Sequence, residues 1–248
     1  MSRRFLIAIT LAAGAVGLAG AAFAQSMTLD LGGPSAGSST ARIVQFLALM
    51  TILTLAPSIM IMVTSFTRIV IVLSLLRTAL GTQQSPPNVV MMSLALFLTG
   101  FVMAPTFTDA YNNGISPLIE EQISEVEAFE AAGRPFHNFM MSHVRQADLD
   151  LFMGMAKATP EQVGANTPFH VLIPAFMISE LRRAFEIGFL LYLPFLVIDM
   201  VVASILMSMG MMMLPPSMIA LPFKLIFFVL VDGWYLVAGS LVQSFNPG

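Results

Sequence analysis

The sequence contains no cysteine, and only 10% of its residues carry a charged side chain. Without cysteine the chain can form no disulfide framework and no thiolate metal site. Soluble domains have about 25% charged residues, so this low fraction argues against a soluble protein. The formal net charge of -3 also excludes the basic footprint that a nucleic-acid-binding protein shows.

Groups that carry enzyme chemistry are scarce as well. The three histidines, His137, His143 and His170, do not stand at metal-ligand spacing. The sequence has no HExxH motif, no GxSxG nucleophile elbow and no phosphate-binding glycine loop. It therefore predicts no catalytic site, no metal and no cofactor, and the histidines are interpreted as structural.

Apolar residues dominate instead. They make up 57% of the chain, and the mean hydropathy is +0.85. Residues 43–108 and the stretch from 187 to the end carry only five charges, whereas most of the others crowd into residues 109–186. Those five are Arg68, Arg77, Asp199, Lys224 and Asp232. The pattern indicates an all-α integral membrane protein with a polar helical domain between two apolar regions.

The first 24 residues are typical of a secretory signal peptide. Arg3 and Arg4 precede an apolar core, and Ala22-Phe23-Ala24 fits the cleavage rule, so the mature chain would begin at Gln25. The alternative is an uncleaved first spanning helix. Residues 25–42 are rich in glycine and serine and predict a flexible lead.

Residues 43–108 predict a first membrane hairpin. The run from Ile43 to Leu80 is too long for one simple span, and Pro57 inside it predicts a kink. It is either one span followed by a helix along the cytoplasmic face, or one long bent helix. The second span, Val89–Thr108, returns the chain to the outside.

Two arginines lie on the first of these runs. Arg68 and Arg77 fit the positive-inside rule. Arg68 is flanked by apolar residues, where a charge facing lipid would be costly. Its side chain therefore either snorkels to the interface or bonds a carboxylate or carbonyls of another helix.

Residues 109–186 predict an extracytoplasmic helical domain. Helices are expected from Pro117 to Glu130, from Pro135, from Thr159-Pro160-Glu161, and from Pro168 to Glu186. The last of them carries a charged cluster that is either a solvated face or a set of partners across subunits. The cluster consists of Glu180, Arg182, Arg183 and Glu186.

Residues 187–248 predict a second hairpin, with arms at about 187–209 and 217–242. Each arm has the roughly 20 residues that a span needs, which makes about four spans with both mature ends outside. The connector, Gly210 to Pro216, is apolar and rich in methionine, which adapts its shape to what it touches. The methionines either fill a core or dip into lipid, or they form a soft plug that closes a pore.

The charges of this hairpin are placed by counting from its turn. Asp199 and Asp232 would both lie roughly 21–23 Å from the turn, at a shared depth, because a helix rises ~1.5 Å per residue. Lys224 would lie close enough to the surface to snorkel. The two acids either hold helices or subunits together by hydrogen bonds, or bind protons and couple transport to a gradient.

Two long stretches resemble the signatures of a known family. TSFTRIVIVLSLLRTALGTQQSPPN, residues 64–88, and VIDMVVASILMSMGMMMLPP followed by ALPFKLIFFVLVDGW resemble those of the FliP family. Its members are flagellar type III secretion export-gate proteins. The resemblance, with the layout between the two blocks, covers nearly all of the mature chain.

The resemblance implies a function and partners. Several copies would assemble with FliQ and FliR into a closed helical pore in the bacterial inner membrane, at the flagellar basal body. The pore would pass unfolded flagellar proteins, and it would stand partly above the membrane plane. A methionine-rich loop lines the constriction in this family, and Met211, Met212 and Met213 match it by position, with Met209 adjacent.

A different function class is an ion-coupled transporter that uses Asp199 and Asp232. Such transporters commonly show paired repeats or broken helices at matching places. The sequence shows no such internal symmetry.

Overall fold

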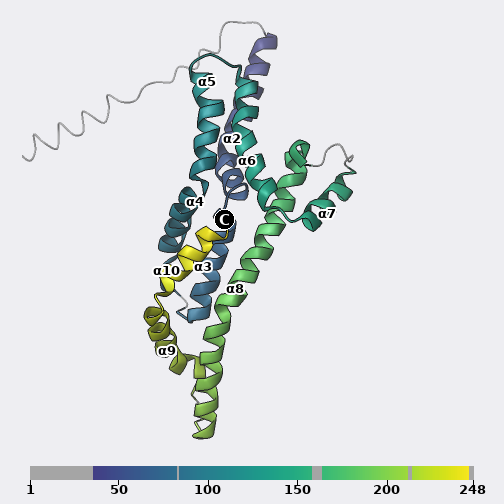
Figure 1. Ribbon diagram of the computed structural model, residues 1–248. Coiled ribbons are helices and arrows are strands. Elements are labelled where there is room, and N and C mark those ends of the chain that lie inside the picture. Colours follow the sequence, from purple (N-terminus) through teal and green to yellow (C-terminus); the bar gives the residue numbers. More distant parts are fainter. Residues whose placement is uncertain (1–35, 83, 158–163, 212–213, 246–248) are drawn as a thin grey trace, which may run out of the picture. The chain divides into compact units, whose positions relative to one another are not determined.

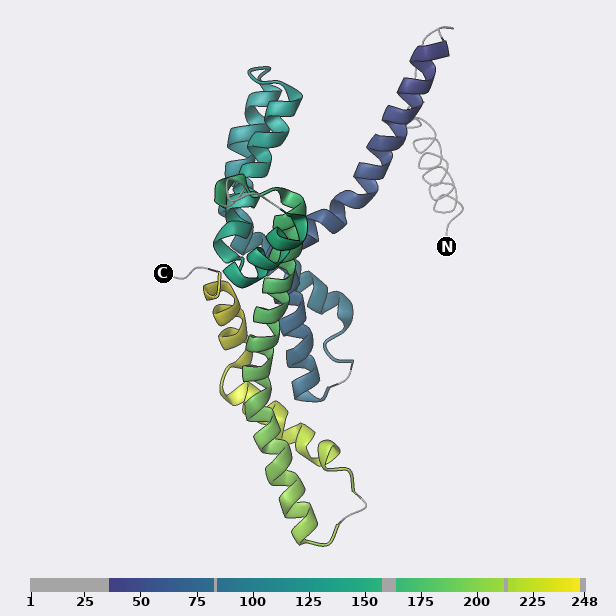
Figure 2. The same ribbon diagram turned by 90° about the vertical axis from the view of Figure 1, so that its right-hand side faces the viewer.

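The computed structural model describes residues 36–82, 84–157, 164–211 and 214–245. All regular structure in these ranges is helical, which confirms the all-α prediction (Figures 1 and 2). The signal peptide, the helix start at residues 159–161, and Met212 and Met213 lie outside the described residues. The chain divides into two compact units, residues 1–54 and 55–248, and each is described by itself.

Helix α2 (Ala36–Met62) begins in the first unit. Its start corrects the flexible lead predicted for residues 25–42, because the last seven of those residues are helical. No proline interrupts the sequence between Pro34 and Pro57, and small residues such as Ala36 fit a helix. The hydroxyl of Thr51 donates to the carbonyl of Leu47 at 2.8 Å, which satisfies a polar group inside an apolar helix.

A helix break opens the second unit. Helix α2 ends at Met62 and α3 (Phe66–Leu80) follows, so the long apolar run is broken rather than straight. Thr64 Oγ1 accepts from the backbone N–H of Phe66 at 3.4 Å, and Thr67 Oγ1 donates to the carbonyl of Ile61 at 3.3 Å. These hydroxyls bond backbone groups that the break leaves without helical partners.

Helix α4 (Asn88–Ala110) continues beyond the predicted end of the second span at Thr108. A π-helical turn, η1 (Tyr111–Ile115), and α5 (Ser116–Ile119) extend it without a gap. Gly114 of η1 lies against α6, where a side chain would meet the neighbouring backbone. The polar region therefore begins as a continuation of the apolar helix.

Helix α6 (Glu125–His143) corrects two predictions. The acidic helix expected over residues 117–130 is interrupted, and Pro135 lies inside α6 instead of starting a helix. Packing against α4, η1 and α8 compensates for the hydrogen bond that this proline cannot donate.

The start of α6 is set by a capping box. The hydroxyl of Ser124 accepts from the backbone N–H of Glu127, and the Glu127 carboxylate accepts from the backbone N–H of Ser124. The backbone and hydroxyl donors of Ser124 lower the pKa of the Glu127 carboxyl below its ordinary value. This local exchange explains why the helix begins at Glu125 and not at Pro117.

Helix α8 (Phe169–Ser208), the long green helix in Figures 1 and 2, runs from the polar region into the apolar hairpin. Its 40 residues extend about 60 Å at 1.5 Å per residue. The predicted boundary between residues 186 and 187 thus falls inside one continuous helix. Before it come α7 (Gln146–Ala156) and the short η3 (Gly164–Asn166).

The second arm of the hairpin is broken. Helices α9 (Pro216–Leu230) and α10 (Gly233–Gln243) meet at a bend of 64°, which corrects the single arm predicted over residues 217–242. Two helical segments, Asn88–Ile119 and Phe169–Ser208, are each long and apolar enough to cross a membrane. The number becomes four if each of the two bent helix pairs is one span.

The two larger apolar clusters of described residues hold the second unit together. The larger lies along α3, which packs most extensively against α8, and then against α4. The smaller joins α6, α7 and α8 in the polar region, around Met140, Leu172 and Phe176. Helix α8 contributes to both clusters, so it connects the two regions.

Candidate functional site

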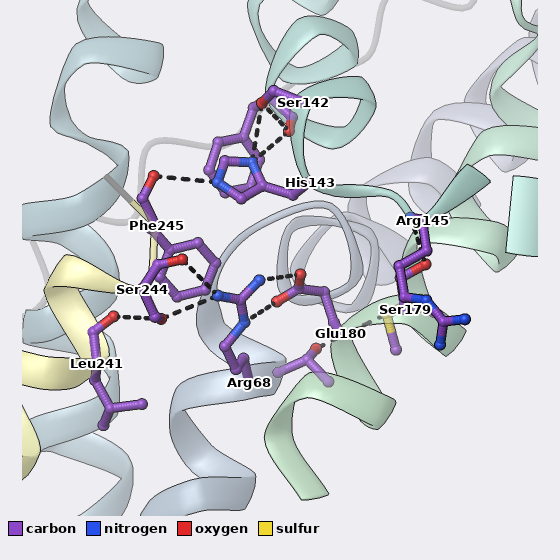
Figure 3. A network of polar contacts seen from close by, with 12 residues as sticks. Arg68, Ser142, His143, Arg145, Ser179, Glu180, Leu241, Ser244 and Phe245 are labelled. Carbon is purple, nitrogen blue, oxygen red and sulfur yellow. Dashed lines mark hydrogen bonds and ion pairs between the residues drawn. The ribbon is translucent and has the colours of Figure 1, made fainter. Parts of the chain in front are cut away.

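A buried ion pair joins α3 to α8. The Nε of Arg68 donates to Glu180 Oε2 at 2.7 Å, and its Nη2 donates to Glu180 Oε1 (Figure 3). The two side chains are 1% and 0% exposed. This two-point contact uses the planar fork of the guanidinium, which lysine does not have.

The remaining donors of Arg68 reach the end of α10. Its Nη1 donates to both the carbonyl oxygen and the hydroxyl of Ser244, each at 3.0 Å. The ring of Phe245 lies 3.7 Å from the guanidinium carbon (Figure 3). One arginine therefore joins three segments that are far apart in the sequence.

These contacts decide between the alternatives that the sequence left open for Arg68 and for the charged residues of positions 180–186. Of the two alternatives for Arg68, the structure shows the bond to a carboxylate and a carbonyl, not a snorkelling side chain. Glu180 is buried and does not belong to a solvated face, which corrects that alternative for this residue. Arg182 and Glu186 do lie exposed and pair with each other at 2.8 Å, and Arg183 is half-buried.

A second ion pair joins α8 to α9. Lys224 Nζ donates to Asp199 Oδ2 at 2.6 Å and to the carbonyl oxygen of Ala79 at 3.1 Å. Lys224 is only 5% exposed, so the snorkelling predicted for it is wrong. Its side chain extends toward the end of α3, where two oxygens neutralise and solvate the ammonium group. Asp199 Oδ1 is buried and has no hydrogen-bond partner among the described residues.

We expect Lys224→Met to lower the free energy of unfolding by about 1–2 kcal/mol. The substitution removes the ammonium group together with its two hydrogen bonds, and it leaves Asp199 without its partner. Thermal unfolding of the purified protein in detergent measures the effect. Arg182→Met, which removes a cation from an exposed pair, is the matched control and should change stability by less than about 0.5 kcal/mol. Equal effects of the two substitutions on stability would contradict a stabilising role of the Lys224–Asp199 pair.

The two aspartates of the C-terminal hairpin are not equivalent. Asp232 lies exposed between α9 and α10 with a positive φ of 50°, whereas Asp199 is paired with Lys224. Among the described residues no hydrogen bond or ion pair joins the two acids. Counting residues from the turn did not give the right position for Asp232. Helix α9 ends before this residue, so the second arm is not one straight helix.

Arg77 has a local role at the other end of α3. Its Nη1 donates to Asn88 Oδ1 at 2.5 Å and to the carbonyl oxygen of Pro86 at 3.3 Å. The side chain thus fixes the connection from α3 to α4.

The methionine-rich loop lies at the tip of the α8–α9 hairpin. Gly210 lies two residues beyond the end of α8 and has a positive φ of 75°, which glycine adopts without strain. Met209 is 62% exposed, and Met211 is half-buried against Val202, Leu206 and Ala220. The structure therefore places one thioether outward and one against the hairpin.

Sequence reasoning missed two residues of the Arg68 cluster, Ser244 and Phe245, and named His143 only as a structural histidine. All three lie 75 to 177 positions from Arg68, and no local motif marks them. Within the described ranges, no group of three or more histidine, aspartate or glutamate side chains could hold a metal ion. The buried charges bond to one another and to carbonyl oxygens, which fixes helices in place.

The fold and these ion pairs define an all-helical integral membrane protein whose buried charges join its helices. The chain belongs to the FliP family, whose model matches residues 49–241. It is accordingly a component of the flagellar type III export gate and not an enzyme, which confirms the resemblance drawn from the two signature stretches.

Relatives from several bacteria are similar over most of the chain. Flagellar biosynthetic protein FliP of Caulobacter vibrioides is 59% identical over 249 residues, covering 100% of this chain and 93% of the relative. The protein of the same name from Bacillus subtilis is 56% identical over 202 residues, covering 82% and 91%. That from Aquifex aeolicus is 51% identical over 205 residues, covering 82% and 86%.

Proposed function

We propose that several copies of this chain assemble with FliQ and FliR into a closed pore in the bacterial inner membrane. The pore passes unfolded flagellar proteins at the centre of the basal body, and residues 109–186 face the periplasm. Membership of the FliP family supports the export-apparatus setting. The apolar surface that the single chain leaves exposed supports the proposed contacts with further chains.

The observation that carries the proposal is the exposed apolar surface of the α8–α9 hairpin. Large apolar side chains point outward along both helices, far more than one chain would expose to water. They include Phe189, Val197, Met200, Met218, Val229 and Leu230. Lipid covers such a surface in part, and neighbouring copies cover the part that faces them in the ring.

The constriction is assigned to the loop at the tip of this hairpin. The sequence of this loop carries Met209, Met211, Met212 and Met213, and each copy contributes these thioethers to the proposed constriction. Cargo of varied sequence needs a seal without fixed shape or charge, and methionine provides one because it is unbranched and polarizable. Gly210 supplies the turn that presents the loop.

We expect replacement of Met211, Met212 and Met213 by alanine to open a leak for ions and small solutes, because each truncation removes three heavy atoms from the seal. Conductance across membranes that carry the assembled complex measures the leak. Motility and secreted flagellin report whether export continues.

The matched control is a variant in which three exposed methionines outside the hairpin, Met60, Met92 and Met155, are changed to alanine. It removes the same number of thioethers and should leave the membrane tight. A loop variant that stays tight and exports normally would refute the seal.

A further inference from the structure

The turn between α5 and α6, residues 120–124, is surrounded by exposed apolar side chains (Figure 1). Phe129, Val126 and Ile119 are 82%, 71% and 69% exposed. A groove of about 490 Å³ lies at the turn, and its lining mixes apolar and polar side chains: Leu118, Glu121, Ile123, Ser124, Glu125 and Val126. The exposed residues of positions 118–130 are called the α5–α6 surface below.

This surface is strongly acidic. Five glutamates lie within residues 120–130, and all of them are exposed. The sequence has no lysine or arginine between Arg77 and Arg134. Among the described residues, none of the five glutamates forms an ion pair. The α5–α6 surface therefore carries negative charge that the chain itself does not neutralise.

The carboxylates border the apolar side chains. On α6, Glu125 stands four residues before Phe129, and Val126 stands four residues before Glu130. Residues four apart lie next to each other on one face of a helix. A molecule that covers the apolar side chains of this face thus meets glutamates beside them.

Glu121 occupies a backbone position that favours glycine. Its φ is 57°, in the left-handed region. The backbone N–H of Glu121 donates to the carbonyl of Leu118, and that of Gln122 donates to the carbonyl of Pro117. Helices with this pair of hydrogen bonds usually end in a glycine, because a side chain is strained there. The fold alone therefore does not explain a glutamate at this position, whereas a contact with another molecule does.

Two possible occupants fit this surface poorly. Carboxylates are costly in hydrocarbon, and anionic headgroups repel them, so a membrane does not suit the surface. A second copy of the chain brings the same sign of charge, since residues 109–186 hold eleven acidic and five basic side chains. Like charges across an interface oppose association. Large apolar side chains clustered in a polar region mark a contact with another protein.

We propose that the α5–α6 surface docks a basic, apolar segment of a different protein. Apolar side chains of that segment cover Ile119, Val126 and Phe129, and its lysines or arginines pair with the surrounding glutamates. Arginine suits both tasks, since it pairs with a carboxylate and also stacks on an aromatic ring. The charges guide the partner and fix its orientation. The surface is independent of the pore assignment, so either proposal can fail alone.

Photo-crosslinking from position 129 in living flagellated cells tests the proposal. Phe129 is replaced by p-benzoylphenylalanine in the full-length chain, and mass spectrometry identifies the crosslinked peptide. The expected product joins position 129 to a different protein, within a segment that carries an excess of lysine and arginine beside apolar residues. The same photoreactive residue at Met155, which is exposed on α7, is the positional control and should not give this product.

Charge reversal tests whether the glutamates contribute to the contact. Glu121→Lys with Glu125→Lys should lower the crosslinking yield roughly tenfold, because two attractions become repulsions. Asp109→Lys with Asp150→Lys makes the same change of net charge at exposed positions outside the surface and should leave the yield unchanged. Glu127 is not altered, because it caps α6. Thermal unfolding in detergent shows that each variant is folded.

Glu121→Gly distinguishes a binding role from a structural one. The variant should have a higher melting temperature, because glycine adopts a positive φ without strain. Its crosslinking yield should nevertheless fall roughly threefold, as expected for the loss of one exposed charge pair. A more stable chain that binds its partner less cannot be explained by damage to the fold.

Several outcomes would overturn the proposal. Position 129 could crosslink only to lipid, only to a second copy, or to no molecule. A captured segment without excess basic residues would contradict the charge argument, and so would a yield that survives the reversal of Glu121 and Glu125.

Discussion

Replacing Arg68 with methionine is expected to lower the free energy of unfolding by about 3–5 kcal/mol. The substitution leaves the Glu180 carboxylate fully buried without a cation, and it removes the donors that hold Ser244. A buried unpaired charge costs far more than the pair itself contributes. The loss should appear as a sharply lower melting temperature in detergent and a lower yield of folded protein.

The double variant Arg68→Met with Glu180→Leu distinguishes two free energies: the destabilisation by an unpaired buried carboxylate, and the net contribution of the ion pair to stability. Two apolar side chains of similar size should recover much of the stability, since no charge is then buried. Arg182→Met, in the exposed pair with Glu186, is the matched control and should be nearly neutral. If Arg68→Met has the same melting temperature as the wild type, the buried pair does not contribute to the stability of the fold.

Gly114→Ala is expected to destabilise the protein by about 3 kcal/mol, at the upper end of the range for overpacking. A methyl group there would lie 2.8 Å from the carbonyl oxygen of Ala128, 2.8 Å from the backbone nitrogen of Ala132 and 2.7 Å from its Cβ. Backbone atoms of α6 cannot move aside as a flexible side chain does, so η1 and α6 must separate. Thermal unfolding measures the loss.

Gly100→Ala is the matched control for that substitution. Gly100 is also helical, but an added methyl group would meet no atom within 4 Å. Alanine has the higher helix propensity, so this variant should be neutral or more stable by up to about 1 kcal/mol. If the two glycine variants behave alike, the close approach of η1 and α6 does not limit stability.

Local patterns predicted the helices well but not their ends. Apolar runs of sufficient length marked the helical regions from Ile43 to Thr108 and from Pro168 to Val242. They did not show that Pro135 lies inside α6, because packing against other elements compensates for the missing hydrogen bond. They also missed the bend at Asp232, which has no proline and only one glycine beside it.

The candidate site was likewise predicted from the sequence only in part. That Arg68 needs a partner follows from its apolar neighbours, since an isolated charge in such a stretch is costly. That the partner is Glu180, 112 positions away, depends on the contact between α3 and α8. The Lys224–Asp199 pair likewise depends on how α9 folds back along α8.

The amino-acid sequence by itself determined the membrane class, the helical composition, the family and the absence of enzyme motifs, because these are written in composition and in contiguous stretches. Only the tertiary structure decided which charges meet, where the long helices break and how the C-terminal turn is held. Those features depend on contacts between residues far apart in the chain, and no local pattern encodes the distance between two helices.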